Sequence, residues 1–331
     1  MPQLLALPLE LIWLILYHLE SKREINAAVQ TCRYFYETFN VYLYRYDTKN
    51  HNRSALSWAA RHNSGATLAK SLNAGPYTEV RDRDGNTPLI LAARFCDESF
   101  LKPLLTLVNR GVDLEARNHV GRTALAEAAW RGRAEIAKLL LESGAKIESR
   151  DNDGSTPLIL AAVDGHEKVV KLLLDRGAAV EAKCRLRQTA LSWAAGGAHL
   201  TSVELLLERG ARLNTRDTYG RTPLSHAAGP GYEAVVKRLL EAGADPNRRD
   251  FRGMSPMHYA AFFSPNEAVM RRLLEAGGDP RAIVPQGLRN CRTLADLAGT
   301  ASSGTSENEA VRDLLLKAAA GDGPTGAPGT R

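Results

Sequence analysis

Apolar and polar positions recur along this chain with a fixed period of 33 residues. The phrase Gly-x-Thr-Pro-Leu-x-x-Ala-Ala begins at Gly154 and Gly220, with related phrases at the two positions that continue this spacing, Arg187 and Gly253. A second phrase, Leu-Leu-x-x-Gly-Ala, keeps step with the first and also repeats every 33 residues. Two phrases in fixed phase predict a stack of identical structural units, because a periodic sequence builds a periodic structure.

Each unit predicts two short antiparallel helices. In Thr156-Pro157 and its equivalents, a hydroxyl caps the helix start and proline occupies the first turn, where its missing N–H costs nothing. The second helix carries an apolar stripe such as Val169, Leu172 and Leu173, and Gly177 follows it as the expected left-handed residue. Such a unit cannot bury its own apolar face, so the predicted fold is an all-α solenoid with β-turn hairpin tips.

These phrases resemble the ankyrin repeat. The resemblance covers residues 52–317, about eight units, and implies a protein that binds other proteins. Arg187 stands where the repeat places a turn glycine, so we expect a less tight turn there. The Gly/Pro/Ala-rich residues 318–331 predict a disordered tail.

The N-terminal residues 1–47 lie outside the repeat and predict a small helical module with more apolar surface than it can bury alone. Its order Leu-Pro-x-Glu-Leu, then spaced aliphatic residues and Cys-Arg-x-Phe, resembles an F-box. That resemblance implies docking on a Skp-type adaptor of a cullin-RING ubiquitin ligase. The residues implied to contact the adaptor are Leu7, Pro8, Leu11, Ile15, Cys32 and Phe35. The alternative is that this segment only caps the first repeat.

Composition and charge bear on nucleic-acid binding, membrane insertion and cellular location. The chain carries 43 Lys and Arg against 37 Asp and Glu, and they are interleaved, as in Arg248-Arg249-Asp250. We therefore expect a near-neutral surface that does not bind nucleic acid. The apolar run 11–17 is too short to span a membrane. Four cysteines form no disulfide framework, which favours a reducing compartment and a cytoplasmic or nuclear location.

No residue pattern predicts catalysis, a cofactor or a metal site. The cysteines are too far apart for a zinc or redox pair. His166 and His199 recur at one repeat position, and His258 follows Ser-Pro at the position where the ankyrin histidine bonds the helix start, so all three are interpreted as architectural. Once the repeats and the N-terminal module are assigned, too little chain is left for an enzyme domain, so the chain is not expected to be an enzyme.

Large aromatic and arginine side chains at solvent-facing repeat positions are the candidate partner contacts, because these residue types dominate binding hot spots. They are Phe95, Trp130, Arg131, Tyr219, Arg221, Phe251, Arg252 and Phe262. For Phe262 and Phe263 the alternative is that they lean on a neighbouring repeat and are half-buried. The sequence thus predicts a substrate-recognition subunit of a Skp–cullin–F-box ubiquitin ligase, with an ankyrin scaffold lacking any ubiquitin role as the alternative.

Overall fold

The computed structural model describes residues 60, 81–105, 112–285, 291–299 and 306–321. The chain divides into two compact units, Met1–Val112 and Asp113–Arg331, and each is described by itself. All regular elements in these described ranges are helices. The first unit holds α6 (Pro88–Phe95) and α7 (Glu98–Leu105), which pack against each other. The predicted adaptor contacts at residues 7–35 lie outside the described residues.

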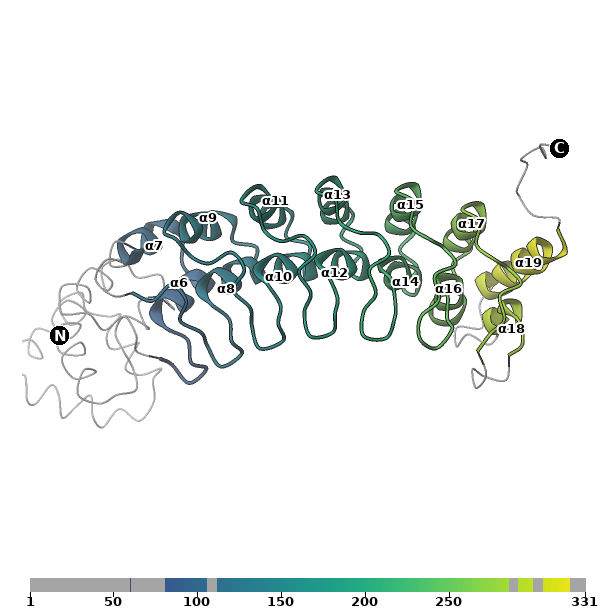
Figure 1. The fold of residues 1–331 in the computed structure, drawn as a ribbon, viewed down its shortest axis with the longest axis horizontal. Coiled ribbons are helices and arrows are strands. Elements are labelled where there is room, and N and C mark those ends of the chain that lie inside the picture. Colours follow the sequence, from purple (N-terminus) through teal and green to yellow (C-terminus); the bar gives the residue numbers. More distant parts are fainter. Residues whose placement is uncertain (1–59, 61–80, 106–111, 286–290, 300–305, 322–331) are drawn as a thin grey trace, which may run out of the picture. The chain divides into compact units, whose positions relative to one another are not determined.

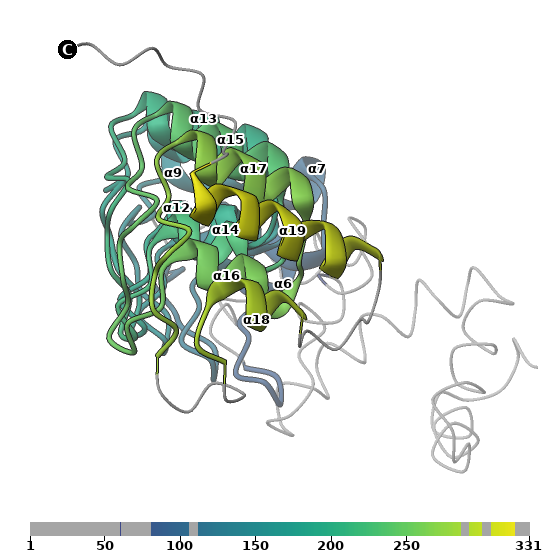
Figure 2. The same cartoon turned by 90° about the vertical axis from the view of Figure 1, so that its right-hand side faces the viewer.

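The second unit is built from helix pairs. Its helices are α8 (Ala124–Trp130), α9 (Ala134–Glu142), α10 (Pro157–Val163), α11 (Glu167–Asp175), α12 (Ala190–Gly196), α13 (Leu200–Glu208), α14 (Pro223–Ala228), α15 (Glu233–Glu241), α16 (Pro256–Phe263), α17 (Glu267–Glu275), α18 (Leu294–Gly299) and α19 (Ser306–Ala320). Within this unit the even-numbered helices form one row and the odd-numbered helices a second row, drawn above the first (Figures 1 and 2). Hairpin loops extend from the first row, on the side away from the second (Figure 1).

The first helix of each pair begins where the sequence predicts it. The Thr156 hydroxyl accepts a hydrogen bond from the Ile159 backbone N–H at 3.4 Å, and Pro157 fills the first turn. All residues of α10 from Pro157 to Ala162 are buried, because the helix lies against α8, α12 and its own partner α11. The small Ala161 and Ala162 side chains let these neighbouring helices pack closely.

The three histidines interpreted as architectural contact backbone groups, and they join one repeat to the next. The Nε2 atom of His166 lies 2.9 Å from the Trp130 carbonyl oxygen, and that of His199 lies 3.0 Å from the Val163 oxygen. His258 has a different role: its Nδ1 accepts from the Ser255 backbone N–H at 3.1 Å, and its Nε2 lies 3.1 Å from the Ile283 carbonyl oxygen. Each ring therefore satisfies backbone groups at helix ends or in the repeat that follows.

The structure differs from two expectations, the looser turn at Arg187 and the start of the C-terminal tail. Arg187 adopts a left-handed conformation with φ of 58°, and its N–H donates to the Cys184 carbonyl oxygen at 2.8 Å. The equivalent bond from Gly154 to Asp151 is 3.0 Å, so the expected loosening of the Arg187 turn is wrong. Helix α19 continues to Ala320, so residues 318–320 of the predicted tail are helical. The rest of the predicted tail, apart from Gly321, lies outside the described residues.

Replacing Gly121 by alanine tests how closely consecutive hairpins approach. Gly121 has φ of 79°, and a Cβ there would collide with the Asn152 side chain and lie 2.7 Å from the Asn152 backbone nitrogen. Gly177 has φ of 82° but meets nothing within 4 Å. We expect Gly177→Ala to lose about 1 kcal/mol of unfolding free energy from backbone strain alone. Gly121→Ala should lose roughly 1–3 kcal/mol more from the clash.

Equilibrium urea unfolding followed by circular dichroism measures both variants. Equal losses for Gly121→Ala and Gly177→Ala would contradict the close packing of neighbouring hairpins.

Candidate functional site

Buried aspartates organise three of the hairpin tips. Asp217 is 2% exposed, and its Oδ1 accepts the backbone N–H groups of Tyr219 at 2.8 Å and Arg221 at 2.9 Å. Asp151 and Asp250, which occupy the same repeat position, make the same pair of bonds to the residues two and four positions later. These carboxylates therefore point into the turn and leave the outer surface of the tip to other side chains.

Neighbouring tips are also bonded to one another. The Thr218 N–H donates to the Leu186 carbonyl oxygen at 2.9 Å, and the Phe251 N–H donates to the Tyr219 oxygen at 3.0 Å. The Arg216 guanidinium adds a third link by donating from Nη2 to the Arg249 carbonyl oxygen at 2.7 Å. A surface held by this many backbone bonds loses little conformational entropy when a partner binds.

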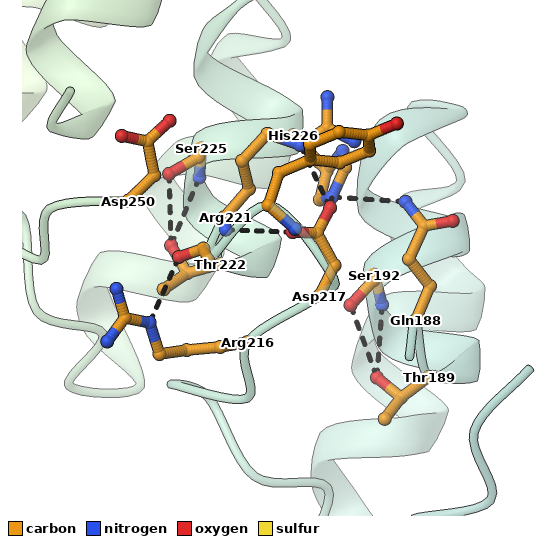
Figure 3. Close-up of polar contacts among 12 residues, drawn as sticks. Gln188, Thr189, Ser192, Arg216, Asp217, Arg221, Thr222, Ser225, His226 and Asp250 are labelled. Atoms are coloured by element: carbon orange, nitrogen blue, oxygen red, sulfur yellow. Dashed lines mark hydrogen bonds and ion pairs between the residues drawn. The ribbon is translucent and has the colours of Figure 1, made fainter. Parts of the chain in front are cut away.

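A polar network behind the tips fixes the conformation of Asp217 (Figure 3). Its Oδ2 accepts from Arg221 Nε at 2.9 Å and from His226 Nε2 at 3.2 Å, and His226 in turn lies 3.2 Å from the Gln188 amide nitrogen. Burial by itself raises the pKa of Asp217, but the bonds from His226, from the Arg221 and Tyr219 N–H groups and from the Arg221 side chain together lower this pKa to about 2. Asp217 is therefore ionised throughout the physiological range.

Two serine hydroxyls beside this network contact helix caps. The Ser192 and Ser225 hydroxyls lie 3.3 and 3.2 Å from the capping hydroxyls of Thr189 and Thr222, so both serve helix starts. His226 bonds to Asp217, which in turn accepts the N–H groups of its turn, so this pair stabilises the tip.

Tyr259 takes the place of His226 in the next repeat. Its hydroxyl donates to Asp250 Oδ2 at 2.6 Å. Burial, together with the bond to Asp250, raises the pKa of the Tyr259 hydroxyl above its ordinary value, so it stays a proton donor at neutral pH. Two different side chains thus serve the same buried carboxylate position.

Arginine guanidinium groups lie over several aromatic rings of the second unit. The Arg122 and Arg131 groups lie 4.0 and 4.2 Å from the centre of the Trp130 ring. On the tips, Arg221 lies 4.9 Å from the centre of the Tyr219 ring, and Arg216 lies 4.7 Å from that of Phe251. Cation–π contacts of this length hold both partners in place at a solvent-exposed site.

The predicted contact residues differ in how they present themselves to solvent. Tyr219 is 51% exposed and Phe251 is 67% exposed, and Arg131 and Arg252 are also exposed. Arg221 is half-buried against Asp217, and Trp130 is half-buried under its two arginines. Phe95 is exposed in the first unit, where Arg94 lies over its ring at 5.4 Å.

Phe262 is not a solvent-facing contact in this structure. It is half-buried and packs against the core, whereas Phe263 is 62% exposed. Phe263 meets Phe262 edge-to-face at 4.8 Å and stacks on Tyr259 at 5.9 Å. The reason is that Phe262 lies on the core side of α16, which leaves the next residue at the helix end for the outer surface.

The selected candidate contacts leave out two exposed apolar residues of the tips: Val120 lies at a position that the repeat leaves free, and Leu186 was missed. Leu186 is 44% exposed and Val120 is 54% exposed. Both occupy the same repeat position as Tyr219, so the 33-residue register was the signal that could have found Leu186.

Neither a membrane span nor a metal cluster appears among the described residues. No helix there combines the length and apolarity that crossing a bilayer requires. Nor does this part of the chain bring together three His, Cys, Asp or Glu side chains that could hold a metal ion.

Comparison with known proteins identifies the class of protein. A family model described as ankyrin repeats (3 copies) matches residues 56–151, 101–184, 144–217, 180–250 and 212–284. These overlapping matches extend over well more than half of the chain, which therefore belongs to the ankyrin-repeat family. No curated protein matches the chain significantly. Membership of this family indicates a protein–protein interaction function.

Acid titration of stability tests the role of Asp217. Because its pKa is lowered from 3.8 to about 2 in the folded chain, the ionised carboxylate stabilises the fold above about pH 4, and this contribution is lost as pH falls towards 2. We expect Asp217→Asn to lose about 2 kcal/mol of unfolding free energy at pH 7, with the difference from the unmodified chain shrinking between pH 4 and pH 2.

Asp153→Asn is the control for this experiment, because Asp153 is exposed in an equivalent turn. Urea unfolding at pH 7, 4 and 2 should find the control within about 0.5 kcal/mol of the unmodified chain. A difference for Asp217→Asn that does not change with pH would contradict the assigned role.

Proposed function

We propose that this protein is the substrate-recognition subunit of a Skp–cullin–F-box ubiquitin ligase that acts in the cytoplasm or nucleus. Residues 1–47 dock the Skp-type adaptor through the F-box-like motif, and the hairpin side of the ankyrin repeats binds the target protein. Target binding by the repeats is supported by the row of exposed Tyr219, Phe251 and Arg252, which lie on tips that hydrogen bonds hold in register. Adaptor docking is supported by the sequence motif from Leu7 to Phe35.

The contribution of such a subunit to ubiquitin transfer is proximity. It performs no bond-making step itself, but it holds target lysines near a ubiquitin-loaded partner and so converts an encounter in solution into a reaction within one complex. A rigid array suits this task, because a bound target then keeps a defined orientation toward the rest of the ligase.

The rival function is an interaction scaffold without a ubiquitin role. In that case the apolar stripes of residues 1–47 pack only on the first repeat and cap the array. The two functions differ in what deletion of these residues removes: the ligase subunit loses its adaptor, whereas the scaffold loses stability but keeps every partner.

Substitution of Leu7 by aspartate tests adaptor docking. A charge at a residue that docks into an apolar adaptor site should weaken the complex between the full chain and a purified Skp-type adaptor by roughly thirtyfold or more. Ser21→Asp adds the same charge in the polar break of this segment and should leave the affinity within about twofold. Isothermal titration calorimetry measures both affinities.

Circular dichroism and the urea midpoint of each variant confirm that the repeats remain folded. The absence of a complex between the unmodified chain and the adaptor at micromolar concentration would contradict the proposal, as would an unchanged affinity for Leu7→Asp.

A further inference from the structure

We propose that three consecutive hairpin tips form the docking site for an acidic, extended segment of the target protein. We define the basic tip surface as residues 183–188, 216–221 and 248–254. The inference rests on the proposed function in one respect, that the hairpin side binds the target, and it adds the chemistry of what is bound.

The charge of this surface is the first observation. It contains eight basic side chains and two acidic ones. The basic residues are Lys183, Arg185, Arg187, Arg216, Arg221, Arg248, Arg249 and Arg252, and the acidic residues are Asp217 and Asp250. Both aspartates are buried and bonded within their own turns, so the charge that reaches solvent is positive. The expectation of a near-neutral surface from interleaved charges is therefore wrong at these tips.

The side of the array formed by the second helices shows that the excess of basic side chains is local to the tips. There, charges are paired between consecutive second helices: Arg176 with Glu142 at 3.3 Å, and Arg272 with Glu233 at 3.4 Å. On the basic tip surface, by contrast, no carboxylate of the described residues lies within 4 Å of the exposed guanidinium groups of Arg185, Arg187, Arg248 and Arg252. These four groups are available for carboxylates of a partner, which the guanidinium fork binds with two parallel hydrogen bonds.

Apolar side chains between the arginines add contact area. Leu186, Tyr219 and Phe251 are 44%, 51% and 67% exposed, and the tips that carry them are joined by backbone hydrogen bonds. Arg216 and Arg221 each cover a face of one of the two rings. Single-stranded nucleic acids bind by stacking bases on free ring faces, so this arrangement favours a peptide over a nucleic acid.

The spacing of the tips fixes the register of the bound segment. Each hairpin has two limbs, which backbone hydrogen bonds join to each other, as from the Asp217 N–H to the Arg221 carbonyl oxygen. Similar bonds join neighbouring hairpins, as from the Phe251 N–H to the Tyr219 carbonyl oxygen. Two strand spacings per hairpin place equivalent tip residues about 10 Å apart. A polyproline II segment advances about 9 Å in three residues and returns to the same face. We therefore assign a segment with a carboxylate at every third position.

Direct binding to synthetic peptides tests this inference. The probes are a fluorescein-labelled peptide of repeating Glu-Pro-Pro units and a peptide of the same composition with its glutamates clustered at one end. Fluorescence anisotropy is measured with the full chain at low salt and at physiological salt. We expect the regular peptide to bind several times more tightly than the clustered one, and salt to weaken the binding because the arginines are exposed.

The decisive variant is Arg185→Glu with Arg248→Glu and Arg252→Glu. These side chains are exposed and bonded to no carboxylate, so their reversal should leave the fold intact and weaken binding of the regular peptide by roughly tenfold or more. The matched control reverses the same number of charges on the second-helix side, as Lys138→Glu with Lys168→Glu and Lys171→Glu. It should change the affinity by less than about twofold.

Three results would overturn the inference. Equal weakening by the tip and control variants would show a non-specific charge effect, and equal affinity for the two peptides would remove the assigned register. Tighter binding of a single-stranded oligonucleotide than of the regular peptide would identify nucleic acid as the ligand. Adaptor affinity, measured on the same preparations, should be unchanged in the tip variant. A chain that binds the peptide but not the adaptor would refute the ligase function and leave the acidic-segment site standing.

Discussion

Burial of the first helices α10, α12, α14 and α16, each between two neighbouring first helices, is the interaction on which the rest of the second unit depends. In α10, every residue from Pro157 to Ala162 is buried, and the covering surfaces come from three other helices. Neither α10 nor its partner α11 could hide this apolar area alone. Stability therefore resides in the interfaces between repeats, and the array behaves as a chain of nearest-neighbour contacts.

The same stacking sets the geometry of the tips. Because consecutive first helices are in contact, the hairpins that precede them are brought close enough for backbone bonds such as that from Phe251 to Tyr219. The buried Asp217 and Asp250 then satisfy the N–H groups of their turns, and in doing so they leave the outer surface to arginine and aromatic side chains. Stability and recognition thus use different faces of the same turn.

The fold was predictable because it repeats. Thr-Pro at a helix start and glycine after a helix end have local causes, and seeing them several times in one phase removes the ambiguity of a single occurrence. The surface was less predictable. Interleaved Arg and Asp indicate neutrality only if both reach solvent, and nothing in the local sequence states that Asp250 turns inward while Arg252 turns outward.

Which of two adjacent residues at a helix end is exposed is equally hard to predict from the local sequence. Phe262 and Phe263 are adjacent and chemically identical, and only the packing of α16 on its neighbours decides which one is buried. At Arg187, the sequence suggested a looser turn, but the turn closes with a non-glycine residue in the left-handed conformation, and the Arg187 N–H donates to the Cys184 carbonyl oxygen. For the two phenylalanines, the deciding interaction therefore lies outside the local segment.

Hydrogen–deuterium exchange of the full chain carrying Leu191→Ala tests the nearest-neighbour account most directly. Leu191 is 1% exposed in α12, and its truncation removes core contacts worth about 2–5 kcal/mol. The account predicts the largest loss of amide protection in the pair α12 and α13, a smaller loss in the adjoining pairs α10–α11 and α14–α15, and little change in α18 and α19. A loss confined to α12, or one spread evenly over the whole array, would contradict it.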